Sequence, residues 1–172
     1  MIGRMTIGEE SFDVSGTSWM DHEFGSADLG PDLVGWDWFS LQMADQTELM
    51  LYRLRRADGT TDAASSGTFV DREGRGHPLS VTDFTLEPLS FWTSGVSHAR
   101  YPQRWRLTVP SKNLSLELLP RMAEQELRTD RSTNVTYWEG AIESRGTSDG
   151  KPVVGLGYME LTGYAERFTK KL

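Results

Sequence analysis

Hydrophobic and polar residues alternate with a period of two along most of this chain. Such alternation is typical of β-strands, whose successive side chains point to opposite faces. It predicts strands over 3–7, 11–16, 17–24, 36–43, 48–56, 67–71, 81–88, 103–110, 114–120, 135–144 and 151–164. Between them lie segments rich in Gly, Asp, Asn, Ser and Pro, where the chain reverses easily. The pattern predicts an all-β, antiparallel protein.

The short connections predict how these strands are arranged. About ten strands joined in a meander favour an up-and-down barrel over a sandwich, because closing the sheet removes its exposed edges. Residues 122–128 are the one candidate for a short helix, with helix and loop as equal alternatives. No repeat of fixed period occurs, so residues 1–172 are expected to form a single domain.

One spacing, an aromatic residue two positions before an acid, recurs along the chain. In the strand predicted near the N-terminus it places Trp19, Asp21 and Glu23 on one face, and it recurs at 137–139 and 158–160. Two interpretations remain open. This face is either the outer, wetted side of the barrel or the barrel interior, where aromatic rings contact an apolar ligand.

The strand predicted over 36–43 has large apolar groups on both faces. Trp36 and Trp38 lie on one side, while Phe39 and its alternate neighbours lie on the other. A strand covered on both sides fits a filled barrel wall or a wall packed against another domain. Arg53 and its neighbours in "YRLRR" also alternate with apolar residues, so they either neutralise interior acids or, as we favour, lie at the surface.

An acid among aromatic residues has a definite chemical use. Loss of hydration raises the pKa of the carboxyl group, which makes it a proton donor near neutral pH. Protonation of an electron-rich double bond leaves a carbocation that water can capture and that aromatic faces can stabilise. Asp21 and Glu23, flanked by Trp19, are the candidates for this hydratase chemistry. In the alternative interpretation these acids only accept hydrogen bonds from loop backbone.

Other catalytic classes find little support in the sequence. His22 lies on the face opposite Asp21 and Glu23, so the three adjacent groups cannot converge on one metal ion. His77 and His98 are not spaced in a way that indicates metal ligands. Serines are abundant, but the sequence has no "GxSxG" motif. We therefore expect neither a metal nor a Ser-His-acid triad.

Composition narrows the class of protein. The 172 residues are 37% hydrophobic and 25% charged, and no apolar run is long enough to span a bilayer. The formal net charge of −7 repels nucleic-acid phosphates. The chain has no cysteine, and its first residues lack the apolar core of a signal peptide, so we expect no export signal in the chain as given.

Several longer motifs occur together and in order. They are "SGTSWMDHEFGS", "GWDWFSLQMADQTELMLYRLRRADG", "WTSGVSHARYPQRWRLTVP", "YWEGAIE" and "GLGYMELTGY". With these motifs the chain resembles the family of carotenoid 1,2-hydratase (hydroxyneurosporene synthase) and AttH-like proteins. The resemblance covers about Gly3 to Tyr164 and is strongest to the bacterial AttH-like members.

The resemblance implies a fold, a site and a ligand class. It implies a two-domain lipocalin-like protein of which this chain is the C-terminal half. It further implies an elongated hydrophobic ligand (isoprenoid, lipid or polyketide-like), with water addition to double bonds as one known activity and a periplasmic or secreted location as common. The family's aromatic-x-Asp pair falls on Trp19 and Asp21, with Trp here in place of Tyr.

These considerations define a set of candidate residues and three hypotheses. The candidate catalytic residues are Asp21 and Glu23. The candidate ligand-binding residues are Trp19, His22, Trp36, Trp38, Tyr52, Arg53, Trp92, Tyr101, Tyr137 and Glu139. No cofactor is expected. The chain is a hydro-lyase acting on an apolar alkene, a carrier without turnover, or a half-protein that pairs with a second copy or a partner domain.

Overall fold

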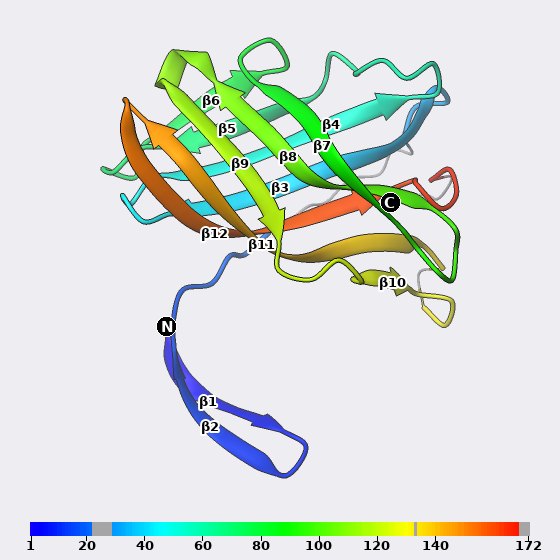
Figure 1. The fold of residues 1–172 in the computed structure, drawn as a ribbon, viewed down its shortest axis with the longest axis horizontal. Coiled ribbons are helices and arrows are strands. Elements are labelled where there is room, and N and C mark those ends of the chain that lie inside the picture. Colours follow the sequence, from blue (N-terminus) through cyan, green and yellow to red (C-terminus); the bar gives the residue numbers. More distant parts are fainter. Residues whose placement is uncertain (22–28, 133, 169–172) are drawn as a thin grey trace.

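The computed structural model describes residues 1–21, 29–132 and 134–168, and β-strands account for most of them (Figure 1). The strands are β1 (Ile2–Ile7), β2 (Glu10–Ser15), β3 (Leu33–Met43), β4 (Glu48–Arg56), β5 (Ser66–Val70), β6 (Gly76–Ser80), β7 (Thr85–Thr93), β8 (Arg100–Val109), β9 (Leu114–Pro120), β10 (Glu126–Arg128), β11 (Thr136–Ser148) and β12 (Lys151–Thr162). A single turn of 3-10 helix, η1 (Pro110–Lys112), joins β8 to β9.

Ten of these strands form one curled antiparallel sheet. Their order is β6-β5-β4-β3-β12-β11-β9-β8-β7, with β10 paired to β11. Most strands that follow one another in the chain are neighbours, except β6 with β7 and β9 with β10, and β3 pairs with β12 to join the two halves of the sheet. Among the described residues no ladder links β6 to β7, so the curled sheet is open between these edges. This architecture confirms the prediction of an antiparallel, up-and-down, lipocalin-like all-β fold.

The curled sheet packs its apolar side chains on one face, which we call the inner face. Phe39 and Leu41 of β3 and Trp105 of β8 are completely buried there, and the rings of Phe39 and Trp105 meet edge to face at 5.5 Å. Alternate residues of the same strands, such as Trp36 and Trp38, therefore lie on the opposite, outer face.

The structure corrects several local predictions, among them the strand predicted over 81–88, which is shifted to Thr85–Thr93. Residues 17–21 form no strand, and the remainder of that predicted strand lies outside the described residues. Residues 122–128 form no helix and instead contribute β10. A strand, β6, occupies part of 72–78, which the sequence predicts to be a loop. Pro78 is tolerated in β6 because an edge strand has one side without ladder hydrogen bonds.

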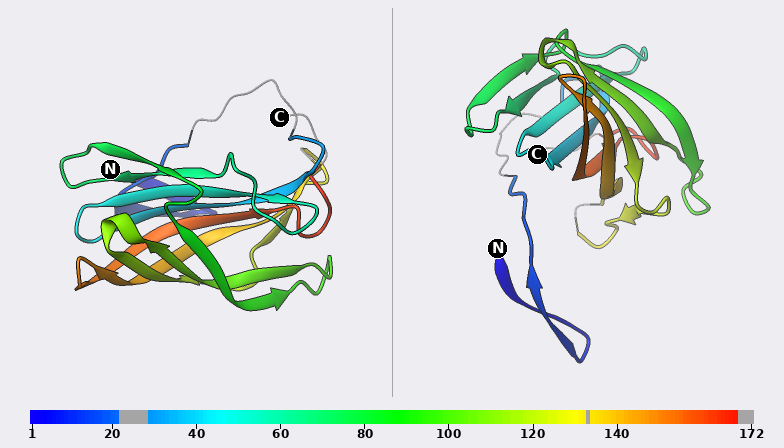
Figure 2. Two further views of the ribbon diagram at one scale, coloured as in Figure 1. Left: turned by 90° about the horizontal axis from the view of Figure 1, so that it is seen from above. Right: turned by 60° about the vertical axis from the view of Figure 1, so that its left-hand side comes forward.

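The two N-terminal strands form a separate hairpin. β1 pairs with β2 in register, and Gly8 adopts a positive φ of 62° in the tight turn. Figures 1 and 2 show this hairpin projecting away from the curled sheet, to which a linker joins it.

Candidate functional site

A row of aromatic and acidic side chains crosses the outer face of four neighbouring strands. Strand register sets Glu139 of β11 opposite Glu160 of β12, Glu160 opposite Trp38 of β3, and Trp38 opposite Tyr52 of β4. Side chains directly opposite each other on one face are close enough to interact. The row therefore brings together residues far apart in the sequence.

The linker after the hairpin adds Trp19 to this face. The Trp19 ring meets the Trp38 ring edge to face, with centroids 6.4 Å apart. The hydroxyl of Thr17 donates a hydrogen bond of 2.8 Å to Oε1 of Gln42, which ties the linker to β3. Nε1 of Trp19 is buried and has no hydrogen-bond partner among the residues that the structure describes. An unpaired buried donor is unusual in a folded protein.

Hydrogen bonds orient one of the two acids. Nε1 of Trp36 donates to Oε1 of Glu160 at 2.8 Å, and the hydroxyl of Thr162 donates to the same oxygen at 3.1 Å. The Trp36 ring also packs edge to face against Phe168 at 4.8 Å.

The second acid, Glu139, lies in a different environment. Burial raises the pKa of its carboxyl above the ordinary value of 4.5, and no charged partner within the described part of the chain offsets that effect. The pKa of the neighbouring Tyr158 is also raised, first by burial and then by the charges of Glu139 and Glu160. The two acids on one face thus have different environments, because Glu160 accepts hydrogen bonds from Trp36 and Thr162 whereas burial dominates at Glu139.

We expect the raised pKa of Glu139 to appear in the stability of the protein. Its charged form is disfavoured in the folded state, so the folded protein binds the proton more tightly than the unfolded chain. The resulting loss of folding stability is absent below the ordinary glutamate pKa. It develops as the pH rises from there through the raised pKa of Glu139. Glu139→Gln should therefore raise the melting temperature at neutral pH by a few degrees and leave it unchanged near pH 4.

Thermal unfolding at several pH values measures this difference. Glu143→Gln is the matched control, because Glu143 lies on the same strand and face but is exposed and paired with Arg121 at 3.1 Å. If Glu139→Gln raised the melting temperature equally at every pH, this result would contradict a raised pKa of Glu139.

The structure divides the predicted site residues into two groups. Six lie together on or over the outer face, and with Tyr158 and Glu160 they define the outer-face site. They are Trp19, Trp36, Trp38, Tyr52, Tyr137 and Glu139. This arrangement favours the outer-face interpretation of the aromatic-x-acid pairs. Asp21 is exposed, two residues beyond Trp19, while His22 and Glu23 lie outside the described residues. The catalytic roles of Asp21 and Glu23 stay predictions.

The other three predicted residues, Arg53, Trp92 and Tyr101, lie on the inner face. Trp92 stacks on Tyr101 at 6.0 Å, and the Arg53 guanidinium lies 5.0 Å from the centre of the Trp105 ring. They are thus separated from the outer-face site by the sheet itself. The sequence favoured a surface position for Arg53, and this prediction is wrong. Its side chain lies on the inner face, where it pairs with an acid on the neighbouring strand.

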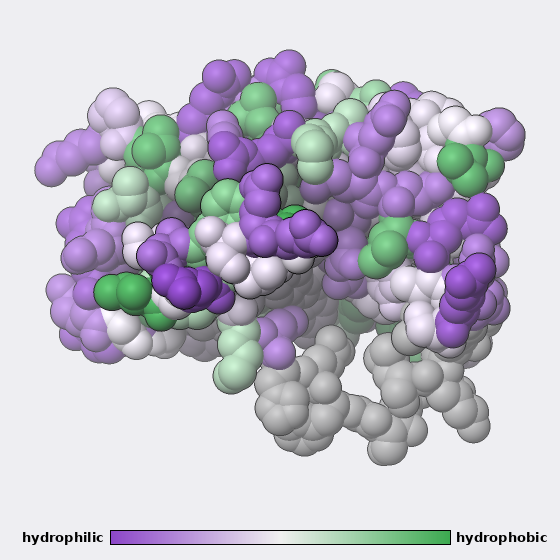
Figure 3. Space-filling view, turned by 90° about the horizontal axis from the view of Figure 1, so that it is seen from below, coloured by the Kyte–Doolittle hydropathy of each residue, from purple (hydrophilic) through white to green (hydrophobic). Residues whose placement is uncertain are grey.

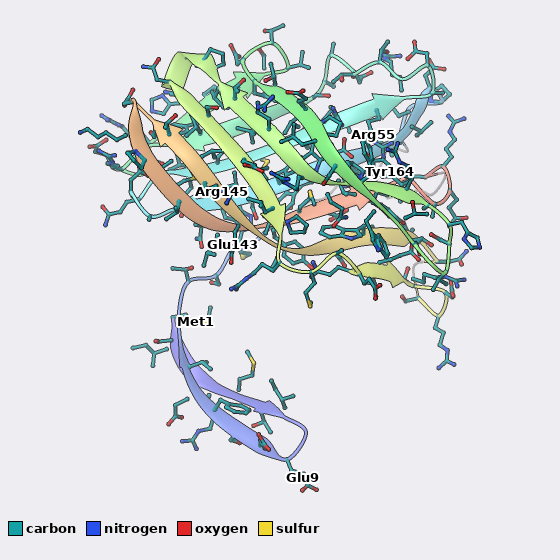
Figure 4. The ribbon with its side chains drawn as sticks, in the orientation of Figure 1. Met1, Glu9, Arg55, Glu143, Arg145 and Tyr164 are labelled. Carbon is teal, nitrogen blue, oxygen red and sulfur yellow. The ribbon has the colours of Figure 1, made fainter. Side chains whose placement is uncertain are left out.

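That acid is Asp37, which is completely buried. Nη2 of Arg53 lies 2.7 Å from Oδ2 of Asp37, and Nε of Arg55 lies 3.2 Å from Oδ1. The hydroxyl of Tyr164 donates to Oδ1 at 2.8 Å. Figure 4 shows Arg55 beside Tyr164, whose ring centre is 3.8 Å from the guanidinium. Burial, and then the charge of Asp37, raises the pKa of Tyr164.

Asp37 and its partners are missed by reasoning that looks for an aromatic residue two positions before an acid, because Gly35 holds that position here. The available signal is an acid on the otherwise apolar face of Phe39 and Leu41, together with an Arg-x-Arg spacing on the next predicted strand. A buried acid requires a counter-charge, which alternating arginines can supply.

The described residues contain no group of three His, Asp or Glu side chains placed to hold a metal ion. A search of the same residues finds no helix with the length and apolar character needed to cross a membrane.

Comparison with known proteins identifies the family. The model of the AttH-like family matches residues 1–164. The chain belongs to the AttH-like family. No curated protein matches this AttH-like chain significantly.

Two solved structures resemble the AttH-like chain. A protein assigned as AttH from Nitrosomonas europaea is 33% identical, with a TM-score of 0.84 over 95% of this chain and 49% of that one. Kievitone hydratase from Nectria haematococca shares the fold at 20% identity, with a TM-score of 0.75 over 96% of this chain and 50% of that one. The chain thus spans about half the length of each protein.

Proposed function

We propose that the outer-face site binds an apolar, unsaturated small molecule, and that a carboxyl group of the site protonates a double bond of that molecule. In this proposal the chain corresponds to the C-terminal lipocalin-like half of a two-domain protein. The ligand is an elongated isoprenoid, lipid or polyketide-like molecule that lies along the aromatic side chains.

The observation that carries the proposal is the half-buried Glu139 on the aromatic outer face. Its pKa is raised by burial, so a larger fraction of the group holds a proton near neutral pH than an exposed glutamate would. Asp21 and Glu23 also stay candidates for the acid. Kievitone hydratase, a structural neighbour of the same fold, is named for a hydration reaction, which agrees with this chemistry.

The proposed reaction is the addition of water to a carbon–carbon double bond. The carboxyl proton moves to one alkene carbon and leaves a carbocation on the other. The faces of Trp38 and Tyr158, together with the carboxylate of Glu160, stabilise this positive charge. Water then attacks the cation, and its surplus proton returns to the carboxylate, so the products are one alcohol and the regenerated acid.

A carrier without turnover is the second candidate. It rests on the same aromatic side chains of the outer face, such as Trp19 and Trp38, which can contact an apolar ligand whether or not a proton is transferred. Both candidates place the ligand on the outer face.

Ligand binding tests that placement. We expect Trp38→Leu to weaken binding of kievitone or of an acyclic isoprenoid alkene about tenfold, since the variant loses most of one aromatic contact. Calorimetric titration of wild type and variant measures the change.

Trp92→Leu is the matched control, because Trp92 is also a half-buried tryptophan but lies on the inner face. It should leave the affinity unchanged, provided that circular dichroism shows both variants folded. Loss of binding in Trp92→Leu with retention in Trp38→Leu would move the ligand to the inner face and overturn the proposal.

A further inference from the structure

The N-terminal hairpin has one polar and one apolar face. On its polar face, Arg4 pairs with Asp13 at 2.9 Å and Thr6 meets Ser11 at 3.0 Å. The register places four apolar side chains on the opposite face. They are Met5, Ile7, Phe12 and Val14, with 39–64% of their surfaces exposed.

A hairpin of this kind requires a partner. An isolated two-stranded hairpin is at best marginally stable in water, and its apolar face must pack on another surface. Within the described structure that face is uncovered, and Figures 1 and 2 show the hairpin directed away from the curled sheet. The described residues of the same copy therefore do not supply the contact that this face needs.

The sheet has an exposed apolar surface of its own. Val154, Leu156 and Tyr158 follow one another on the outer face of β12 and are 58%, 59% and 40% exposed. We call these three residues the β12 stripe. Its first two residues line a groove of about 520 Å³, together with Leu119 and Thr17. Seen from below, hydrophobic side chains lie exposed among hydrophilic ones on this side of the molecule (Figure 3).

The geometry of the linker keeps the two apolar surfaces of one copy apart. Thr17 lies in the groove and is bonded to Gln42, while the hairpin begins immediately before it and extends outward. Figure 4 shows Glu143, also a groove residue, where the linker meets the sheet, and Glu9 at the far end of the hairpin. The hairpin thus starts beside the β12 stripe of its own copy but extends away from it. That stripe is therefore open to the hairpin of a second copy.

We propose that two copies of the chain exchange hairpins, so that the apolar face of each hairpin packs on the β12 stripe and groove of the other copy. A reciprocal exchange is a closed two-fold arrangement that covers four apolar surfaces in one interface. The occupant is a second copy because the chain itself carries both complementary surfaces, and they adjoin at Thr17. The exchanged hairpin would also cover the end of the outer face that carries Tyr158.

Sedimentation velocity over a wide range of concentrations tests this arrangement. The wild type should be a dimer at micromolar concentration. Phe12→Ser and Leu156→Ser should each raise the dimer dissociation constant about a hundredfold, because each dimer contains the lost contact twice. Thr6→Ala is the control, since it removes a polar-face side chain of the hairpin and should leave the dimer intact.

Cross-linking identifies the surfaces in contact. The chain has no cysteine, so a bis-maleimide can join only introduced ones. A Phe12→Cys chain mixed with a differently tagged Leu156→Cys chain should give a mixed cross-linked dimer, and Thr6→Cys with Leu156→Cys should not. A monomer at high micromolar concentration would overturn the proposal. So would a dimer that survives Leu156→Ser and cross-links only hairpin to hairpin.

Discussion

Replacement of Asp37 by Asn should lower the free energy of unfolding by about 3–5 kcal/mol, the usual cost of breaking a buried ion pair by removing one partner. Asp37 is completely buried and accepts contacts from Arg53, Arg55 and Tyr164. The variant leaves two guanidinium groups facing a neutral amide. It also weakens the connection between β3, β4 and the segment that contains Tyr164.

Urea denaturation measures this loss, and Asp32→Asn is the matched control. Asp32 also faces an arginine, Arg56, but the contact is 3.8 Å long and the Asp32 side chain is 77% exposed. A pair of this kind contributes at most about 1 kcal/mol. Equal destabilisation by the two substitutions would contradict the role of Asp37 as the centre of a buried charge cluster.

Much of the sheet could be predicted from local sequence. The bounds of β4 and β9 agree with the predicted ranges 48–56 and 114–120, because clear alternation there ends at turn residues. The prediction failed for β6, where Gly76 and Pro78 have the composition of a turn. It also failed at 17–21, where the alternation belongs to a linker whose Trp19 packs on Trp38.

The site was only partly predictable, because alternation does not say which face is buried. Both faces of β3 carry large apolar residues, so the pattern could not decide between Trp38 and Phe39 as the inner side chain. The contact of Asp37 with Tyr164 joins positions 127 residues apart, and no local pattern indicates it. In contrast, the spacing of Tyr137 and Glu139 did predict that both side chains lie on one face of the sheet, which is the outer face.

The largest effect on activity is expected for Glu139→Gln. If the Glu139 carboxyl donates the proton, the amide cannot replace it, and turnover should fall about a hundredfold or more. Binding of the alkene should change little, because Gln has nearly the same size and polarity. Glu143→Gln, on the same strand and face, should leave turnover unchanged.

Mass spectrometry of the product formed in ¹⁸O-labelled water tests the central claim that water is added to an alkene at the outer face. The account predicts a product with one ¹⁸O atom from the wild type and from Glu143→Gln, and about a hundredfold less of it from Glu139→Gln. If Asp21→Asn lost the labelled product while Glu139→Gln kept full activity, Asp21 would be the proton donor instead of Glu139. A wild-type protein that binds the alkene and forms no labelled product would contradict the claim.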